Sequence, residues 1–520
     1  MKFPRPRIRI AIAIALLTAG CATPRLDMPR PASYALPDGH STPLGQAFAG
    51  EARAHPGLSG FQLLASGHAA LVSRGALADM ATKTLDLQYY SVGQDLTTHL
   101  LLERLLAAAQ RGVRVRVLLD DVHPEARDFA RQAIALHPSI HVRLFNPFLS
   151  TGTSTLARLG EFAVDGERLN RRMHNKLWVA DNVVGIIGSR NLGDEYFDTK
   201  AAASFVDIDL LAVGPVVQQM SRAFDDYWNS AAAWPGQAFG LQATEEQRLQ
   251  AQQALRGRNA ACHTVPPCHW LRENGVGIAL RNGQLALTWA AASLAYDPPE
   301  LPKLDVPTGI AHSHAARGTG EAPGELLIVS PYLIPGDDGL EHLAGMRERG
   351  DRIAALTNSL ASTDSPAAHA GYAAHRRHLL EQGVELYEIR PAPGRRHRET
   401  HRWGRASPGS LHAKFVVLDR RQVVLGSRNQ DPRSRLHNTE SWVTIDSPEL
   451  AAELAGLFDE GTDLHHAFKL QLQDSDTGPR LIWLTEEEGV VVRHEAEPGA
   501  GFWLQLWRDL LSLLLPEHML

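Results

Sequence analysis

The sequence has little of three features that often decide the class of a protein. Its 520 residues include three cysteines, and its formal net charge of −6 gives no basic excess, so bulk electrostatics do not indicate a nucleic-acid binder. Neither of its two apolar runs reaches the roughly 20 residues that a permanent membrane-spanning helix needs. It does have 44% hydrophobic and 21% charged residues, which is typical of a globular protein, and a length that predicts two domains.

The first 21 residues, MKFPRPRIRIAIAIALLTAGC, have the order of an export signal. Basic residues come first, an apolar run over 10–17 follows, and small residues precede Cys21. The ending LTAGC resembles the signal of bacterial lipoproteins, which implies that Cys21 carries lipid. An ordinary secretory peptide with an incidental cysteine is the alternative. Because Ala22 follows, and not the Asp that retains lipoproteins in the inner membrane, the resemblance implies a lipid-anchored, periplasm-facing protein of the bacterial envelope, with the outer membrane favoured over the inner membrane.

The other two cysteines, Cys262 and Cys268, lie close together in CHTVPPC. In an exported chain such a pair favours a disulfide, because the compartment is oxidising. A zinc site that also uses the flanking His263 and His269 is the alternative. Four ligands so close in sequence, with two prolines between them, would be cramped for a tetrahedron.

Alternating strand and helix patterns occur in both halves of the chain. TLDLQYYSV and VRVRVLLDD have the period of strands and enclose the helical stretch DLTTHLLLERLLAAAQRG. In the second half, ELLIVSPYLI and DRIAALTNS enclose DDGLEHLAGMRERG in the same way. We therefore predict an α/β fold of two similar domains, each a mixed, mostly parallel sheet flanked by helices, packed as a pseudo-twofold pair.

Composition also divides the chain into segments. The expected division is a signal at 1–21, a Pro-rich tether at 22–45, domain 1 at 46–235, a connector at 236–300, domain 2 at 301–470 and a C-terminal segment with an apolar helix at 471–520. In the last segment, FWLQLWRDLLSLLLP is expected to be a helix buried against domain 2 or, alternatively, inserted into a membrane. The basic stretch 394–405 would either bind anionic head groups or form a solvated loop.

One unusual cluster of polar residues is present in both halves. MHNKLWVADNVVGIIGSRN and LHAKFVVLDRRQVVLGSRN share the spacing H-x-K-x4-D followed by G-S-x-N. Strand alternation places the His and Lys of each copy on one face, and a turn at the Asp returns the Ser and Asn beside them. The candidate site residues are His174, Lys176, Asp181, Ser189 and Asn191 in the first copy, and His412, Lys414, Asp419, Ser427 and Asn429 in the second.

These side chains suit a phosphodiester that is held by protein groups alone. A neutral imidazole is a nucleophile or a base, whereas Lys, Ser and Asn can donate to anionic oxygens. A metal site fits poorly because each lysine would repel a cation, and GSRN is not the G-x-S-x-G of serine hydrolases. We therefore predict no metal and no cofactor, and one composite site in which one histidine attacks phosphorus and the other serves as acid and base.

The duplicated H-x-K-x4-D pattern resembles that of the phospholipase D superfamily. The surrounding text, such as RRMHNKLWVADNVVGIIGSRNLGDEYF and SPYLIPGDDG, is most similar to bacterial cardiolipin synthases of the C type and their lipoprotein relatives. This resemblance implies a phosphohistidine mechanism, with His174 as the nucleophile and His412 as the acid and base. It also implies an acid that orients each imidazole, and the matching positions are Glu440 for His412 and Asp207 for His174.

The resemblance implies a phosphatidyltransferase of the cardiolipin synthase type that acts on membrane phospholipids, such as phosphatidylglycerol and phosphatidylethanolamine. A phospholipase D that releases phosphatidic acid is the alternative with the same site, because the choice between alcohol and water depends on water exclusion. A nuclease or another phosphodiesterase is a further alternative, although lipid anchoring and net acidity weigh against a nucleic-acid partner. A non-enzymatic binding protein with a decayed site is the least favoured alternative, because both motif copies are complete. Whether an accessory protein takes part in the reaction is left open.

Overall fold

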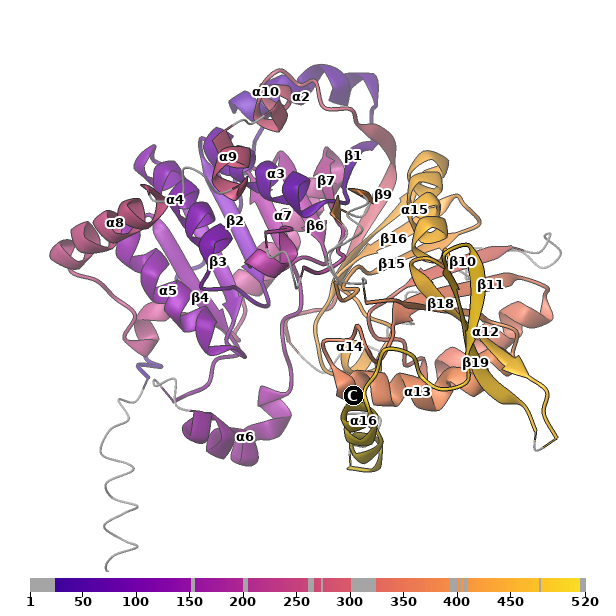
Figure 1. The fold of residues 1–520 in the computed structure, drawn as a ribbon. Helices are drawn as coiled ribbons and strands as arrows, with labels where there is room; N and C mark the ends of the chain where they lie inside the picture. Colours follow the sequence, from indigo (N-terminus) through magenta and orange to yellow (C-terminus); the bar gives the residue numbers. More distant parts are fainter. Residues whose placement is uncertain are drawn as a thin grey trace, which may run out of the picture.

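The computed structural model describes residues 24–150, 155–199, 204–260, 266–272, 275–300, 324–391, 400–401, 404–405, 409–476 and 478–514. Figure 1 shows two α/β halves side by side, with the strand β9 between them. The proposed lipidation site Cys21 and most of the basic stretch 394–405 lie outside the described residues.

Each half is built on a sheet with the same strand order. In the first half the order is β1 (Ser59–Leu64), β7 (Asp209–Val213), β6 (Val184–Gly188), β5 (Leu177–Ala180), β2 (Thr84–Tyr89), β3 (Arg114–Asp120), β4 (Ile140–Phe145) and β8 (Ala233–Pro235). In the second half it is β9 (Thr288–Tyr296), β17 (Ser441–Asp446), β16 (Gln422–Gly426), β15 (Phe415–Leu418), β10 (Glu325–Val329), β11 (Arg352–Asn358), β12 (Glu385–Ile389) and β18 (Ala467–Gln473). The strands β19 (Arg480–Glu487) and β20 (Val490–His494) extend the second sheet, and β13 (Thr400–His401) pairs with β14 (Gly404–Arg405) apart from it.

The prediction of a mostly parallel sheet was wrong. Among the described strands, the parallel pairs within the sheets are β2–β3, β3–β4, β10–β11 and β11–β12, and the remaining pairs are antiparallel. Strand-helix-strand units do give parallel neighbours, but each motif copy is an antiparallel hairpin inserted beside them. The prediction of two similar α/β halves holds, since the strand order of the first sheet, from β1 to β8, is repeated in the second from β9 to β18.

The strand β9 joins the two sheets into one. Its first residues pair with β1, and its remaining residues, Ala291 to Tyr296, pair with β17. The segment expected as a connector therefore supplies the opening strand of the second half. Its helices α8 (Glu245–Ala260), α9 (Pro266–Arg272) and α10 (Gly275–Arg281) pack on helices of the first half.

Helices cover both faces of the joined sheet. On the outer faces lie α3 (Gly67–Met80), α4 (Leu96–Gln110) and α5 (Pro124–Leu136) in the first half, and α12 (Gly336–Glu348) and α13 (Pro366–Glu381) in the second. The inner helices are α7 (Pro215–Asn229) and α15 (Pro448–Gly461). One buried apolar cluster contains residues of both inner helices and of both sheets, so the two halves share a core.

The remaining elements lie at the edges. They are α2 (Pro43–Ala54), α6 (Thr155–Leu169), α14 (Pro432–Leu436), α16 (Phe502–Leu514) and the short 3-10 helices η1 (Asp194–Tyr196) and η2 (Gly236–Phe239). The expected tether is not free, because Ser33 N donates to Asn229 Oδ1 at 3.0 Å and Ala35 N donates to Asp225 Oδ2 at 2.8 Å. Within the described residues, no helix is long and apolar enough to span a membrane.

Candidate active site

The two motif histidines lie where each half contributes an extended segment to the middle of the molecule. His174 and Lys176 directly precede β5, and His412 and Lys414 directly precede β15. All four side chains are buried; the two histidines are 7% exposed and the two lysines 2%. The strand alternation predicted from sequence therefore places charged groups in a dry interior, where an unpaired charge is costly.

Each histidine is paired with an acid, but the predicted pairing was wrong. His174 Nδ1 lies 2.9 Å from Glu440 Oε2, and His412 Nδ1 lies 2.7 Å from Asp207 Oδ2. The imidazole of each half therefore bonds to the carboxylate of the other half. A carboxylate only accepts, so Nδ1 carries the proton and the Nε2 lone pair of each neutral imidazole is left for chemistry.

Backbone contacts explain why the pairs cross. His174 N donates to Thr439 O at 2.8 Å, which places the segment before one histidine beside the acid Glu440 of the other half. In the same way, His412 N donates to Val206 O at 2.8 Å, next to Asp207. These reciprocal contacts cross the boundary between the halves, so spacing within one motif copy does not reveal them.

Each acid is oriented by the serine of its own half. Ser189 Oγ donates to Asp207 Oδ1, and Ser427 Oγ donates to Glu440 Oε2 at 2.5 Å. Ser434 Oγ adds a bond to Glu440 Oε1 at 2.8 Å. The expectation that Ser189 and Ser427 hold anionic oxygens of a ligand is thus replaced by a positioning role, because their hydroxyl protons are committed to the carboxylates.

The site is buried, which shifts the pKa values of its ionisable groups. Burial, together with a smaller effect of Lys414, lowers the pKa of Lys176 to about 7, while Glu440 opposes the shift. Burial and the nearby lysines likewise lower the pKa of His174 to about 4, against the opposing effect of Glu440. The pKa values of His412 and Lys414 are lowered too, mainly by burial. Each half-site feels the lysine of the other, so the two copies form one site.

The pKa of Asp207 is shifted downwards by its neighbours. Burial would raise its pKa, but His412, Arg190 and Lys414 outweigh burial and hold the pKa well below its usual range. Arg190 also fixes the backbone, since Nη2 donates to Asp207 O at 2.5 Å. A carboxylate that stays ionised favours the protonated form of His412, which an acid catalyst requires.

The two motif asparagines are not equivalent. Asn191 is committed to the protein, because Nδ2 donates to Tyr196 OH at 3.0 Å and Oδ1 accepts from Ser91 N at 3.2 Å. Asn429 is buried, and its Oδ1 has no partner among the described residues. Asn429 also lines a cavity together with Arg428 and Asp431, and the motif histidines and lysines do not line it.

The two motif aspartates lie at the far ends of their strands, away from the imidazoles. Asp181 accepts from the backbone N–H groups of Thr82, Lys83 and Thr84, and Asp419 Oδ1 accepts from Glu325 N at 2.9 Å. Both have positive φ, 52° and 54°, as a tight hairpin turn requires. They are turn residues that tie the motif hairpin to the neighbouring strand, as the sequence also indicated.

Several residues around the site were not predicted. The ring of Tyr90 lies edge-on to His174 with centroids 5.0 Å apart, and the ring of Phe205 lies 5.1 Å from His412. Tyr90 follows β2, at the carboxyl edge of the parallel strands where ligand sites form, and that position was a usable signal. Asp120 at the end of β3 accepts from Met173 N at 2.8 Å and so holds the residue before His174.

The cysteine prediction is answered in part. Cys268 in α9 is disulfide-bonded, which removes it from a zinc site, while Cys262 lies outside the described residues. Within the part of the chain that the structure describes, no three His, Cys, Asp or Glu side chains are placed to hold a metal ion together.

Comparison with known proteins gives related sequences and a related fold. The chain matches the family model "Cardiolipin synthase, PLD-like domain" over residues 76–228 and 320–461. It is 36% identical over 473 residues to cardiolipin synthase C of Escherichia coli K12, covering 90% of this chain and 97% of the relative. It is 23% identical over 412 residues to a cardiolipin synthase of Staphylococcus aureus Mu50, covering 79% and 68%. The crystal structure of phosphatidylserine synthase from Haemophilus influenzae Rd KW20 aligns with a TM-score of 0.52 and 13% identity over 83% of this chain and 92% of that one, a likeness in fold.

The crossed pairs predict energetic coupling between the halves. In double-mutant cycles on the free energy of unfolding, His174→Ala with Glu440→Gln and His412→Ala with Asp207→Asn should each give a coupling energy of about 1 kcal/mol or more, because contacting residues are not additive. The same-half combinations, His412→Ala with Glu440→Gln and His174→Ala with Asp207→Asn, serve as controls and should be additive within about 0.5 kcal/mol. Coupling in the controls and not in the crossed pairs would contradict the geometry.

The low pKa of Lys176 predicts proton uptake when an anion binds. An anion beside the ammonium raises the pKa of Lys176 from about 7, so a lysine that is mostly neutral at pH 8 gains a proton on binding. Calorimetry with sulfate at pH 8 in buffers of different ionisation enthalpy should show this uptake, and Lys176→Met should reduce it. A binding enthalpy that is independent of the buffer would refute the electrostatic description of the site.

Proposed function

The chain belongs to the cardiolipin synthase family of phospholipase D-like proteins, and from that premise we propose that it is a phosphatidyltransferase. It would move a phosphatidyl group from one phospholipid to a hydroxyl group of another through a phosphohistidine. The observation that carries this proposal is the pair of buried imidazoles, each held through Nδ1 by an acid and each next to a lysine. Two histidines with free Nε2 atoms supply the two chemical roles that a double displacement needs.

In the first step, His174 Nε2 attacks phosphorus and the bond from phosphorus to the leaving glycerol oxygen breaks. His412 gives its proton to that oxygen, so the leaving group departs as an alcohol. In the second step, His412 removes the proton of the acceptor hydroxyl, the new oxygen bonds to phosphorus, and His174 is released. Lys176 and Lys414 stabilise the negative charge that builds on the non-bridging oxygens.

The electrostatics support this division of roles. The low pKa of His174, about 4, keeps it neutral and nucleophilic at neutral pH. His412 faces Asp207, whose pKa is held well below its usual range, so the imidazolium formed at His412 has a full negative charge beside it. Burial and then the lysines lower the pKa of His412, and a bound phosphodiester would offset the effect of the lysines.

Phosphatidylglycerol is the donor and acceptor that we propose first, with phosphatidylethanolamine as a second lipid and an accessory protein left open. Hydrolysis to phosphatidic acid uses the same phosphohistidine, with water in place of the acceptor hydroxyl. The aromatic rings of Tyr90, Tyr196 and Phe205 around the two histidines support transfer, because they reduce the room for water near the intermediate. We place the enzyme in the bacterial envelope, anchored by lipid at Cys21 and facing the periplasm, with the outer membrane favoured.

Product analysis tests the reaction. Residues 22–520 are incubated with phosphatidylglycerol vesicles, with and without phosphatidylethanolamine, and the lipids are resolved by mass. Cardiolipin should form with the wild-type protein and fall by at least about 10³-fold with His174→Ala or His412→Ala, since each removes a reacting group. Lys469→Ala, on β18 and outside the site, is the control that should keep activity. Phosphatidic acid in place of cardiolipin would identify a hydrolase, and no change in any lipid would contradict both.

The anchor is tested separately. Cys21→Ala, expressed with the complete export signal, should move the protein from the membrane fraction to the soluble fraction in a salt-washed lysate. Ser41→Ala, which keeps Cys21, controls for the effect of a substitution near the terminus. Loss of radiolabelled palmitate from the Cys21→Ala protein is the direct measurement, and equal labelling of both proteins would refute the anchor.

A further inference from the structure

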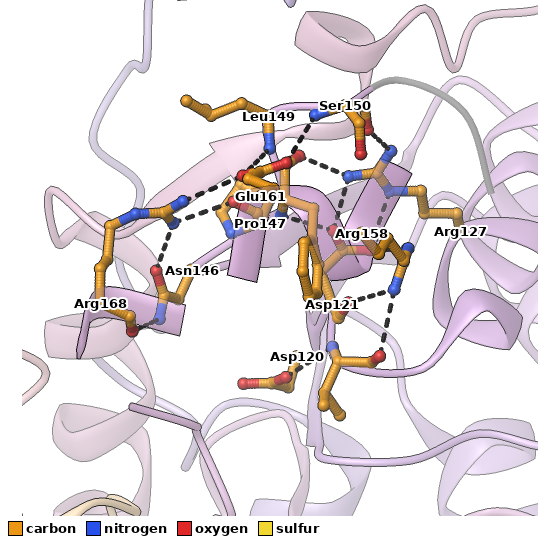
Figure 2. A network of polar contacts seen from close by, with 12 residues as sticks. Asp120, Asp121, Arg127, Asn146, Pro147, Leu149, Ser150, Arg158, Glu161 and Arg168 are labelled. Atoms are coloured by element: carbon orange, nitrogen blue, oxygen red, sulfur yellow. Dashed lines mark hydrogen bonds and ion pairs between the residues drawn. The ribbon is translucent and has the colours of Figure 1, made fainter. Parts of the chain in front are cut away.

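The helix α6 is inverted relative to an ordinary surface helix. α6 is kinked at Asp165, where φ is −128° and ψ is 38°; before the kink, Arg158 and Glu161 lie three residues apart and so share one face. Figure 2 shows Arg158, Glu161 and Arg168 directed at the neighbouring loops of the first half. A soluble protein normally turns the apolar face of such a helix inward.

The inward polar face is firmly bonded. Arg158 Nη1 donates to Asp121 O at 2.9 Å, and Nη2 lies 3.3 Å from Asp121 Oδ1 (Figure 2). The carboxylate of Glu161 accepts from the backbone N–H groups of Leu149 at 2.7 Å and Ser150 at 3.1 Å. These contacts fix the rotation of α6 about its axis, so its outward face is determined by the fold.

The outward face of α6 is apolar. Leu156 is 82% exposed, Leu159 61%, Phe162 40% and Val164 89%. An exposed group of large apolar side chains, rimmed by polar ones, marks a surface that contacts another protein or a membrane.

A second helix has the same property. In α16, Trp503, Leu506, Trp507 and Leu510 are 78%, 48%, 52% and 43% exposed, and their spacing of three and four places them on one face. The helix packs against α13, and Arg508 on it is paired with Glu497. The expected burial of this segment against domain 2 is therefore only partial, because its apolar face is turned outward.

Both helices project from the same edge in Figure 1, and α6 lies shortly before the active-site histidine in the chain. Figure 1 shows α6 and α16 as the two helices that project from the lower edge, on either side of the boundary between the halves. The helix α6 ends at Leu169, five residues before His174. Just beyond it, Asn170 Oδ1 accepts from Arg433 of α14 at 3.1 Å, and α14 also carries Ser434, which bonds to Glu440.

We propose that the outward faces of α6 and α16 dock the protein on a phospholipid bilayer and present the site to its head groups. That the partner of this surface is a bilayer rests on the proposed function. A phospholipid substrate stays in its bilayer, and its phosphate must still reach two buried histidines. Helices that lie in a membrane interface have one large apolar face and a polar face turned away from the lipid, and tryptophan is enriched there. The outward apolar faces of α6 and α16 match this description of an interfacial helix.

Vesicle binding by residues 22–520, which include every described residue, tests the docking surface. Co-sedimentation with phosphatidylglycerol–phosphatidylethanolamine vesicles should fall at least about tenfold in partition coefficient for Leu156→Gln with Leu159→Gln, and again for Trp503→Gln with Trp507→Gln. The matched control is Leu249→Gln with Ile278→Gln, which are 53% and 58% exposed on α8 and α10, away from the lower edge. The control should bind like the wild type, and unchanged thermal unfolding checks the fold of each variant.

Turnover separates this proposal from the proposed function. The α6 variant should lose activity on vesicles but keep it on short-chain phosphatidylglycerol below its micelle concentration, because the site itself is intact. If the variants bind vesicles more weakly but no protein, the wild type included, turns over lipid, the proposed function is rejected and the docking surface is kept. The docking surface would be overturned if the variants bound vesicles as well as the wild type does. It would also be overturned if the wild type were a dimer that the substitutions split without changing vesicle binding.

Discussion

The crossed pairing of imidazoles and carboxylates is the constraint on which the rest of the site depends. Glu440 is held by Ser427 of its own half and is bonded to His174 of the other, and Asp207 and His412 repeat the arrangement. Neither half therefore contains a complete catalytic pair. The shared inner core and the strand β9, which pairs with both sheets, fix the two halves relative to each other as closely as a hydrogen bond demands.

Burial gives the crossed pairs their chemical effect. The two lysines and the carboxylates of Glu440 and Asp207 are enclosed together with the two imidazoles, so their charges interact in an interior where water screens them little. The lowered pKa values of Lys176 and His174 express the cost of burying their charged forms. A bound phosphodiester adds negative charge beside the two lysines, which favours their protonated form and stabilises the charge that grows on its oxygens.

The sequence predicted the local part of this arrangement and not the tertiary part. The repeated motif placed His174 and Lys176 on one face and gave Asp181 a turn, because period-two alternation and hairpin chemistry are local rules. The partner of each imidazole was misassigned, since Glu440 follows His412 closely in the chain and only a contact between the halves shows that it serves His174. The bias towards parallel strands failed for a related reason: strand-helix-strand patterns are visible in sequence, whereas the position of the inserted motif hairpin in the sheet is not.

The helix α6 shows a further limit of periodicity. A 3.6-residue period identifies two faces of a helix but does not say which face turns inward, and the usual assumption buries the apolar one. Here the buried partners decide: Asp121 and the backbone at Leu149 and Ser150 need charged groups from α6, so Arg158 and Glu161 turn inward and the leucines turn outward. Because α6 leads directly into the strand that begins after His174, the same chain segment connects the apolar surface to the nucleophile. In the proposed function, a buried site with two lysines and an apolar surface near it would let an anionic head group reach the nucleophile while the intermediate is shielded from water.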